Sequence, residues 1–221
     1  MKIEVWSDVV CPFCYIGKAS LEQALAESGA EAEVIHRSFR LQPGLAPMPV
    51  DEMLAQKYGL TGAAAEASQK RVTDMAASFG LDFHLAGTVI GDTLDAHKLL
   101  ALASEKGVQQ AVLDRLYRAY FIESRKIFDR ETLLALAEEA GLKRNDMEAA
   151  LASQTYEGQV VADQQQASAY GVRGVPFAVI DGKYAVSGAQ PPQAFRQAFE
   201  AAAKDAAEAP VGEVCTPDGC D

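Results

Sequence analysis

The sequence predicts an α/β protein whose sheet is assembled from the two ends of the chain around a long helical block. Three observations predict this arrangement. A strand–helix–strand pattern occupies residues 2–41, and a hairpin followed by a helix occupies residues 175–209. Between them, residues 51–170 show only helical patterns apart from one break at 81–93. The 221 residues are enough for one domain or for two closely joined ones.

The opening segment predicts a strand, a helix and a second strand. Residues 2–10 contain a short strand pattern, with the single tryptophan, Trp6, packed inside. Residues 15–28 have apolar side chains at helical spacing, and Gly29 is a suitable helix stop. Residues 32–41 form the next strand pattern. Because a helix connects the two strands, parallel pairing is the expected arrangement.

The middle of the chain predicts a series of helices that follows a proline-rich linker. Three prolines lie between Pro43 and Pro49, and Asp129 and Asn145 are the expected N-caps of two helices. The break at 81–93 is predicted to be a loop. The helical patterns occupy residues 51–60, 63–80, 93–107, 108–123, 129–141, 144–153 and 157–171.

The end of the chain returns to strands. Residues 175–188 predict two strands joined by an Asp181-Gly182 turn, and residues 191–209 predict a final helix that begins at a proline.

Composition and charge argue against nucleic acids and membranes as partners. Acidic residues outnumber basic ones by 31 to 20, which gives a formal charge of −11, and no Lys/Arg cluster interrupts the excess. A nucleic acid is therefore not an expected partner. Glu4 and Asp8 interrupt the apolar residues of the N-terminal segment, which does not resemble a signal peptide, and no stretch has the length and apolarity of a membrane span. We expect a cytoplasmic protein that does not bind membranes.

A cysteine pair lies where the first strand gives way to the first helix. Cys11-Pro12-Phe13-Cys14 places one thiol at the helix N-terminus, where backbone N–H groups and the helix dipole stabilise a thiolate. Cys14 lies on the same face, one turn deeper. The spacing predicts an exposed nucleophile, Cys11, and a resolving thiol, Cys14, which together perform thiol–disulfide exchange without a cofactor.

A second pair near the chain end leaves an alternative open. Cys215 and Cys220 flank a four-residue turn pattern, and with Cys11 and Cys14 they could bind zinc through four thiolates. The position of the first pair at a strand–helix junction favours redox chemistry, so no metal is expected. We predict that Cys215 and Cys220 form an auxiliary redox pair that exchanges electrons with the first.

Pro176 also allows two interpretations. It begins the late strand, where a proline at a sheet edge is common. It could instead be a cis-proline whose preceding residue, Val175, offers its backbone to an extended substrate beside the cysteines. Since cis bonds are rare even before proline, Pro176 alone favours the first interpretation.

Two segments of the sequence resemble a known family. SDVVCPFCYIGK near the start and GVRGVPFAVIDGKYAVSGAQ near the end resemble the DsbA family of the thioredoxin superfamily, and in particular its FrnE-type branch. That branch is also similar to 2-hydroxychromene-2-carboxylate isomerases and kappa-class glutathione transferases. The resemblance covers residues 1–205. It implies a thioredoxin-like fold, a central sheet flanked by helices, formed by residues 1–48 and 150–205. Residues 49–149 would be an inserted helical domain, and residues 206–221 a tail.

The resemblance also implies the roles of the site residues. Cys11 would be the nucleophile, Cys14 the resolving cysteine and Pro176 the cis-proline, with Val175, Pro12 and Phe13 beside the substrate. The isomerase and transferase branch has serine where this chain has Cys11, which favours dithiol chemistry here. DsbA-type oxidants have histidine where this chain has Phe13. Without an imidazole to stabilise the thiolate, we predict a less oxidising pair.

The sequence therefore predicts an enzyme that reduces or isomerises protein disulfides, recycled by a thiol reductant or glutathione. The alternatives are oxidation of protein thiols, a glutathione-dependent isomerase or transferase of small molecules, and a zinc-bound interaction module. His97 and Asp92 are further candidates on the substrate side. Lys18 and Asp8 flank the predicted redox helix and could tune Cys11 through their charges, or both could be plain surface residues.

Overall fold

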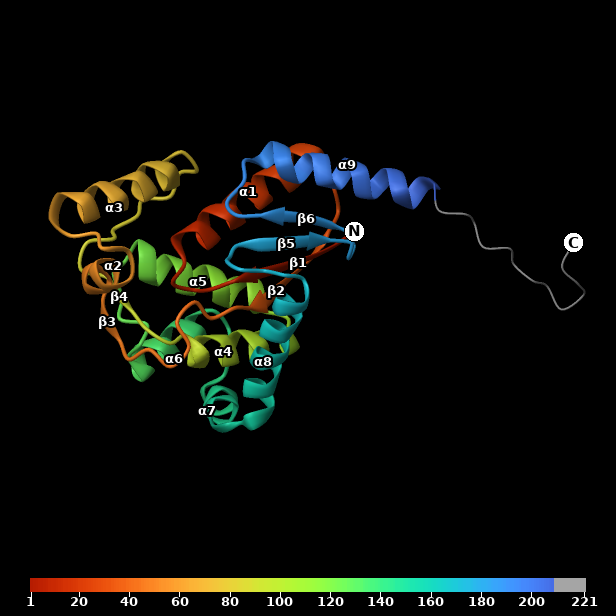
Figure 1. Ribbon diagram of the computed structural model, residues 1–221. Coiled ribbons are helices and arrows are strands. Elements are labelled where there is room, and N and C mark those ends of the chain that lie inside the picture. Colours follow the sequence, from red (N-terminus) through yellow and green to blue (C-terminus); the bar gives the residue numbers. More distant parts are fainter. Residues whose placement is uncertain (209–221) are drawn as a thin grey trace, which may run out of the picture.

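The computed structural model describes residues 1–208, and one mixed four-stranded sheet lies at its centre (Figure 1). The strand order is β2–β1–β5–β6. β1 (Lys2–Ser7) pairs in parallel with β2 (Glu33–Ser38), as the helical connection between them predicts. β5 (Phe177–Ile180) runs antiparallel to both β1 and β6 (Tyr184–Ser187), which confirms the predicted hairpin.

Helices cover both faces of this sheet. α1 (Pro12–Ser28) and α9 (Pro192–Glu208) pack together on one face, where Ile3 and Phe195 belong to a shared core. On the other face, Trp6 packs against Ala167 of α8 (Gln154–Ala169). The alternation of Ile3 and Trp6 across β1 explains why both side chains are fully buried.

The remaining helices lie between β2 and β5 in the sequence. α4–α8 form the helical insertion of a thioredoxin-like fold, and α8 contacts both α4 and β2. α2 and α3 form an arm beside α1 (Figure 1). The helices are α2 (Val50–Tyr58), α3 (Gly62–Ala77), α4 (Leu94–Glu105), α5 (Gln109–Phe121), α6 (Arg130–Glu139) and α7 (Arg144–Ala152).

Among the local predictions in the helical block, one is wrong and two agree with the structure. Residues 81–93 are a loop between α3 and α4 as predicted, except for β4 (Val89–Ile90), which pairs with β3 (Met48–Pro49) of the proline-rich linker. Two-residue strands are too short to show periodicity in a sequence. α7 begins at Arg144 with Lys143 as its N-cap, so Asn145 lies inside the helix. Asp129 caps α6 as expected and accepts a hydrogen bond from the Thr132 amide at 2.9 Å.

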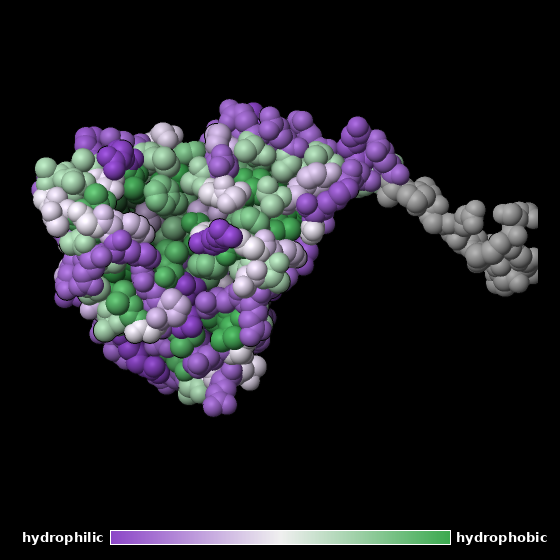
Figure 2. All heavy atoms as spheres, in the orientation of Figure 1, coloured by the Kyte–Doolittle hydropathy of each residue, from purple (hydrophilic) through white to green (hydrophobic). Residues whose placement is uncertain are grey.

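The surface of the described region is uneven in polarity. Hydrophobic residues gather in the area between the α2–α3 arm and α1, whereas the outer side of α9 is largely hydrophilic (Figure 2). Among the helices of residues 1–208, none combines the length and apolarity needed to span a membrane.

Candidate active site

The two N-terminal cysteines occupy the first turn of α1. Cys11 is the N-cap, with an extended backbone conformation and no side-chain capping bond, and Pro12 takes the favoured first helical position. The Cys11 amide donates to the Asp8 carbonyl at 3.1 Å, and the Cys14 amide donates to the Cys11 carbonyl at 3.0 Å. These bonds fix the turn, and both cysteines are free thiols.

The expectation that Cys11 is exposed was wrong. Cys11 is only 4% exposed and Cys14 only 2%, whereas Phe13 is 40% exposed and forms the accessible part of the motif. The Val175 carbonyl oxygen lies 3.6 Å from the Cys11 sulfur and helps to cover it. Both thiols also belong to the hydrophobic core that extends into the helical insertion, and Leu99 lies in that same core. The helix position was predictable, but the covering side chains come from distant parts of the chain.

The peptide bond between Val175 and Pro176 is cis, which decides between the two interpretations of that proline. Pro176 is buried, and β5 begins at the next residue. Gly17 of α1 faces it. A Cβ atom added at Gly17 would lie 2.8 Å from Pro176 Cγ, so the helix approaches this closely only because residue 17 lacks a side chain. Sequence reasoning missed this residue, although a glycine inside a regular helical pattern is a signal of close packing.

The two cysteines sit in different electrostatic surroundings. Burial raises the pKa of Cys14 well above its ordinary value, and the neighbouring Cys11 side chain raises it further. The negative charge of Asp8 acts in the same direction, while a hydrogen bond from the Asp8 backbone lowers the pKa of Cys14. Cys14 therefore remains a protonated thiol at neutral pH, which suits a group that reacts second.

His97 does not lie on a substrate-facing surface. It belongs to the first turn of α4, is 1% exposed and faces the buried carboxylate of Asp8. Its Nε2 atom lies 3.4 Å from Asp8 Oδ1. The suggestion that Asp8 is a surface residue was wrong, because its side chain is fully buried.

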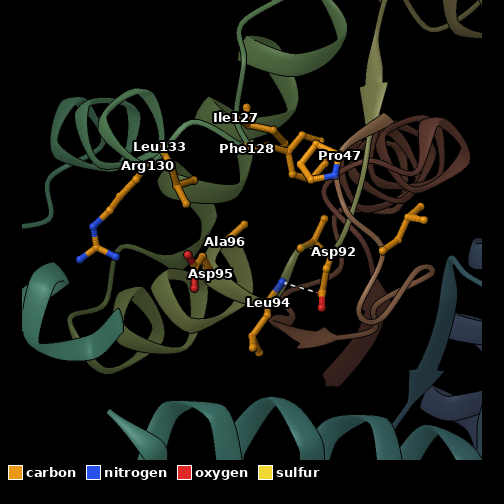
Figure 3. A pocket seen from close by; sticks show the side chains of 11 residues that line it. Pro47, Asp92, Leu94, Asp95, Ala96, Ile127, Phe128, Arg130 and Leu133 are labelled. Carbon is orange, nitrogen blue, oxygen red and sulfur yellow. Dashed lines mark hydrogen bonds between the residues drawn. The ribbon is translucent and has the colours of Figure 1, made fainter. Parts of the chain in front are cut away.

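Asp92 has a structural position at the start of α4. Its carboxylate accepts hydrogen bonds from Arg40 at 3.0 Å, from the Gly44 amide at 2.7 Å and from the Leu94 amide at 3.0 Å. These bonds fasten the segment after β2 to α4. Asp92 also lines a cavity of about 280 Å³ that Pro47 and Phe128 close from the other side (Figure 3). Neither cysteine of the first pair lines this cavity.

Lys18 is buried and carries ion pairs that connect two elements. Its Nζ atom lies 2.5 Å from Glu22 on α1 and 2.5 Å from Asp114 on α5. The suggestion that it is a plain surface residue was therefore wrong. With two carboxylates as partners, Lys18 joins the redox helix to the insertion; a role in tuning Cys11 stays a prediction.

No group of three or more His, Cys, Asp or Glu side chains is arranged to hold a metal ion within residues 1–208. Cys215 and Cys220 lie outside the described residues, so the four-thiolate alternative remains a hypothesis about the complete chain.

The chain also matches a known family model, in agreement with the cysteine turn, the cis-proline and a sheet built from both ends of the chain. Residues 2–200 match the model of the DSBA-like thioredoxin domain. The chain belongs to this family. Its structure is similar to that of a probable DsbA oxidoreductase from Streptomyces coelicolor, with a TM-score of 0.89 and 42% identity over 100% of this chain and 98% of that one.

Two other proteins are more distantly similar to this chain. The uncharacterized protein YwbO of Bacillus subtilis is 31% identical over 158 residues, which cover 70% of this chain and 74% of that protein. The cytosolic disulfide reductase DsbM of Pseudomonas aeruginosa shares the fold, with a TM-score of 0.66 and 21% identity over 92% of this chain and 99% of that one.

Proposed function

We propose that this protein is a FrnE-type thiol–disulfide oxidoreductase that reduces or isomerises disulfides in polypeptides. One observation carries the proposal. The Cys11-Cys14 turn opens α1 directly opposite the cis-proline, with the Val175 carbonyl 3.6 Å from the Cys11 sulfur. This arrangement brings the Cys11 thiol and the backbone of Val175, the residue before the cis-proline, to one place, which suits an extended peptide disulfide.

The reaction proceeds in two exchanges. The Cys11 thiolate attacks one sulfur of the substrate disulfide, and the other substrate sulfur leaves as a thiolate. Cys14 then attacks Cys11, which completes reduction of the substrate and leaves a Cys11–Cys14 disulfide. If another substrate thiol attacks first, the substrate disulfide is rearranged and Cys11 is released unchanged.

The surroundings of the pair favour reduction and isomerisation over oxidation. Phe13 is the exposed residue between the cysteines and offers no imidazole to stabilise a thiolate on Cys11. A pair without that stabilisation is a milder oxidant. The hydrophobic area beside α1 suits unfolded polypeptide segments (Figure 2). We further propose a cytoplasmic location, with glutathione or another thiol reductant recycling the pair.

Insulin reduction and the refolding of scrambled ribonuclease test the proposal. The unmodified protein should accelerate both reactions. Cys11→Ser should abolish both, and Cys14→Ser should abolish turnover in insulin reduction while keeping part of the isomerisation. If the unmodified protein is inactive in both assays, or if Cys11→Ser is as active as the unmodified protein, the proposal is wrong. Glutathione-dependent conversion of a small molecule by Cys11→Ser would favour the isomerase or transferase alternative.

A further inference from the structure

A cavity of about 280 Å³ lies between the start of α4, the start of α6 and the segment after β2 (Figure 3). Neither Cys11 nor Cys14 lines it, and the cis-proline is also not part of its wall. An apolar cavity of about 150 Å³ is large enough to hold benzene. The cavity beside α4 therefore has room for a ring or branched alkyl group together with a small polar head group.

One side of the cavity is apolar and closely packed. Phe128 and Pro47 lie side by side there (Figure 3). A Cβ atom added at Gly91 would lie 3.1 Å from Phe128 Cε1 and 3.2 Å from Pro47 Cα, so these segments meet only because residue 91 lacks a side chain. The Asp92 amide donates to the Leu45 carbonyl at 2.9 Å and holds the wall in place. This side suits an apolar group of a ligand.

Two side chains of opposite charge lie on the other side (Figure 3). Arg130 begins α6, and Asp95 belongs to the first turn of α4. Both are exposed, and neither side chain has a hydrogen-bond or ion-pair partner within residues 1–208. Asp92 differs, because its carboxylate already accepts from Arg40 and from two backbone amides. Arg130 and Asp95 are thus the charged groups of the wall that are available to a ligand.

A buried hydroxyl in the same wall also lacks a partner. Thr93 is the N-cap of α4, but its side chain makes no capping hydrogen bond. It is only 3% exposed, and its Oγ1 atom has no hydrogen-bond partner within residues 1–208. Buried polar atoms are nearly always satisfied, so this orphaned hydroxyl is an independent indication that a ligand completes the wall.

These features distinguish between classes of ligand. A simple anion would use Arg130, but Asp95 would repel it and the apolar side would stay empty. A wholly apolar molecule would leave both charged side chains and the hydroxyl unused. A molecule that carries an ammonium group, a carboxylate and an apolar body uses every part of the cavity.

We propose that the cavity binds a free α-amino acid with a large apolar side chain. Arg130 binds the α-carboxylate and Asp95 binds the α-ammonium group, while the side chain of the ligand packs against Phe128 and Pro47. The site goes beyond the proposed function, because neither cysteine lines the cavity. Its presence or absence leaves the assignment of the redox reaction untouched.

Isothermal titration calorimetry with the full-length protein tests the ligand class. L-Phenylalanine should bind one molecule per chain and saturate at millimolar concentrations or below. N-acetyl-L-phenylalanine lacks the positive charge, L-phenylalaninamide lacks the carboxylate, and L-glutamine keeps the head group on a polar body. Each should bind about tenfold more weakly or worse, since each removes one of the three interactions.

Variants of the two charged residues assign each contact. Arg130→Gln and Asp95→Asn should each weaken the binding of L-phenylalanine about tenfold. Arg130→Gln should also no longer distinguish L-phenylalanine from its amide, and Asp95→Asn should no longer distinguish it from the N-acetyl compound. Arg125→Gln and Asp82→Asn make the same changes at exposed residues outside the wall and should bind L-phenylalanine like the unmodified protein.

Amide hydrogen exchange at saturating L-phenylalanine locates the ligand. Protection should increase in residues 92–96 and 127–133, which include most of the wall. Three outcomes would overturn the inference: no saturable binding of L-phenylalanine, equal binding of the acetylated or amidated compound, or protection confined to the cysteine turn. Binding by Arg130→Gln and Asp95→Asn at the strength of the unmodified protein would overturn it as well.

Discussion

Two hydrophobic cores meet at helix α1, and the cysteine pair belongs to only one of them. The sheet core lies between the strands, α1 and α9, and includes Leu21 and Phe199. The insertion core lies among the inserted helices and includes Cys11, Cys14 and Phe121. The cysteine motif lies at the start of the sheet domain, yet most of the apolar side chains in its core come from the insertion, while the neighbouring Val175 precedes β5. The insertion therefore shapes the apolar surroundings of the pair, whereas the sheet core joins the strands to α1 and α9.

Truncating one phenylalanine in each core should give the largest difference between the two cores. Phe121→Ala and Phe199→Ala each remove a buried ring and should each lower the free energy of unfolding by about 3–5 kcal/mol. Phe121 stacks on Phe83 and contacts Tyr15, which follows Cys14. Only Phe121→Ala should therefore shift the equilibrium of the Cys11–Cys14 pair with glutathione. Urea denaturation measures the loss of stability, and the fraction of oxidised protein in glutathione buffers measures the redox equilibrium. Equal redox shifts in both variants would show that the insertion core has no special influence on the cysteine pair.

The buried His36 of β2 predicts the second-largest effect, a loss of folding stability at acid pH. Burial lowers the pKa of His36 to about 4, while in the unfolded chain it stays near 6.5. The unfolded state binds the proton more readily, so stability is full above pH 6.5 and is lost as the pH falls towards 4. The loss attributable to His36 should reach about 3 kcal/mol. His36→Gln should show a correspondingly smaller loss of stability between pH 7 and 4, and an unchanged loss would contradict the assignment.

The contact between α1 and the cis-proline should give a smaller effect. Gly17→Ala places a methyl group against the Pro176 ring and should cost about 1–3 kcal/mol of stability and slow insulin reduction. Gly158→Ala is the control. Within residues 1–208, and apart from the neighbouring residues and backbone of α8 itself, no atom lies within 4 Å of a Cβ added at Gly158, so that change should stabilise the protein by up to about 1 kcal/mol. Thermal melts and insulin assays of both variants make the comparison, and a Gly17→Ala protein as stable and active as the original would show that the contact is dispensable.

Removing the second cysteine pair, Cys215 and Cys220, should have the smallest effect on the attack by Cys11. If Cys215 and Cys220 pass electrons to the first pair, Cys215→Ser/Cys220→Ser should slow repeated turnover without changing the single-turnover attack by Cys11. Steady-state and single-turnover insulin reduction distinguish the two steps. Unchanged rates in both would mean that the described part of the chain needs no second pair.

The sequence predicts features that depend on neighbouring residues and misses those that depend on distant ones. Helical periodicity, the Asp181-Gly182 turn and the position of Cys11 at the start of α1 are local, and each agrees with the structure. The cover over Cys11 and the contact between Gly17 and Pro176 join segments far apart in the chain. No periodic pattern encodes such contacts, because they arise only when the segment before β5 packs against α1.

The cover over Cys11 has a consequence for oxidative damage. Oxidation of a cysteine to sulfenic and then sulfinic acid depends on thiolate character and on access for the oxidant. A thiol that is only 4% exposed beneath the Val175 carbonyl admits a peptide only after local adjustment, and it also restricts the approach of peroxide. The same packing should therefore shield Cys11, the nucleophile of the proposed function, from irreversible oxidation between catalytic cycles.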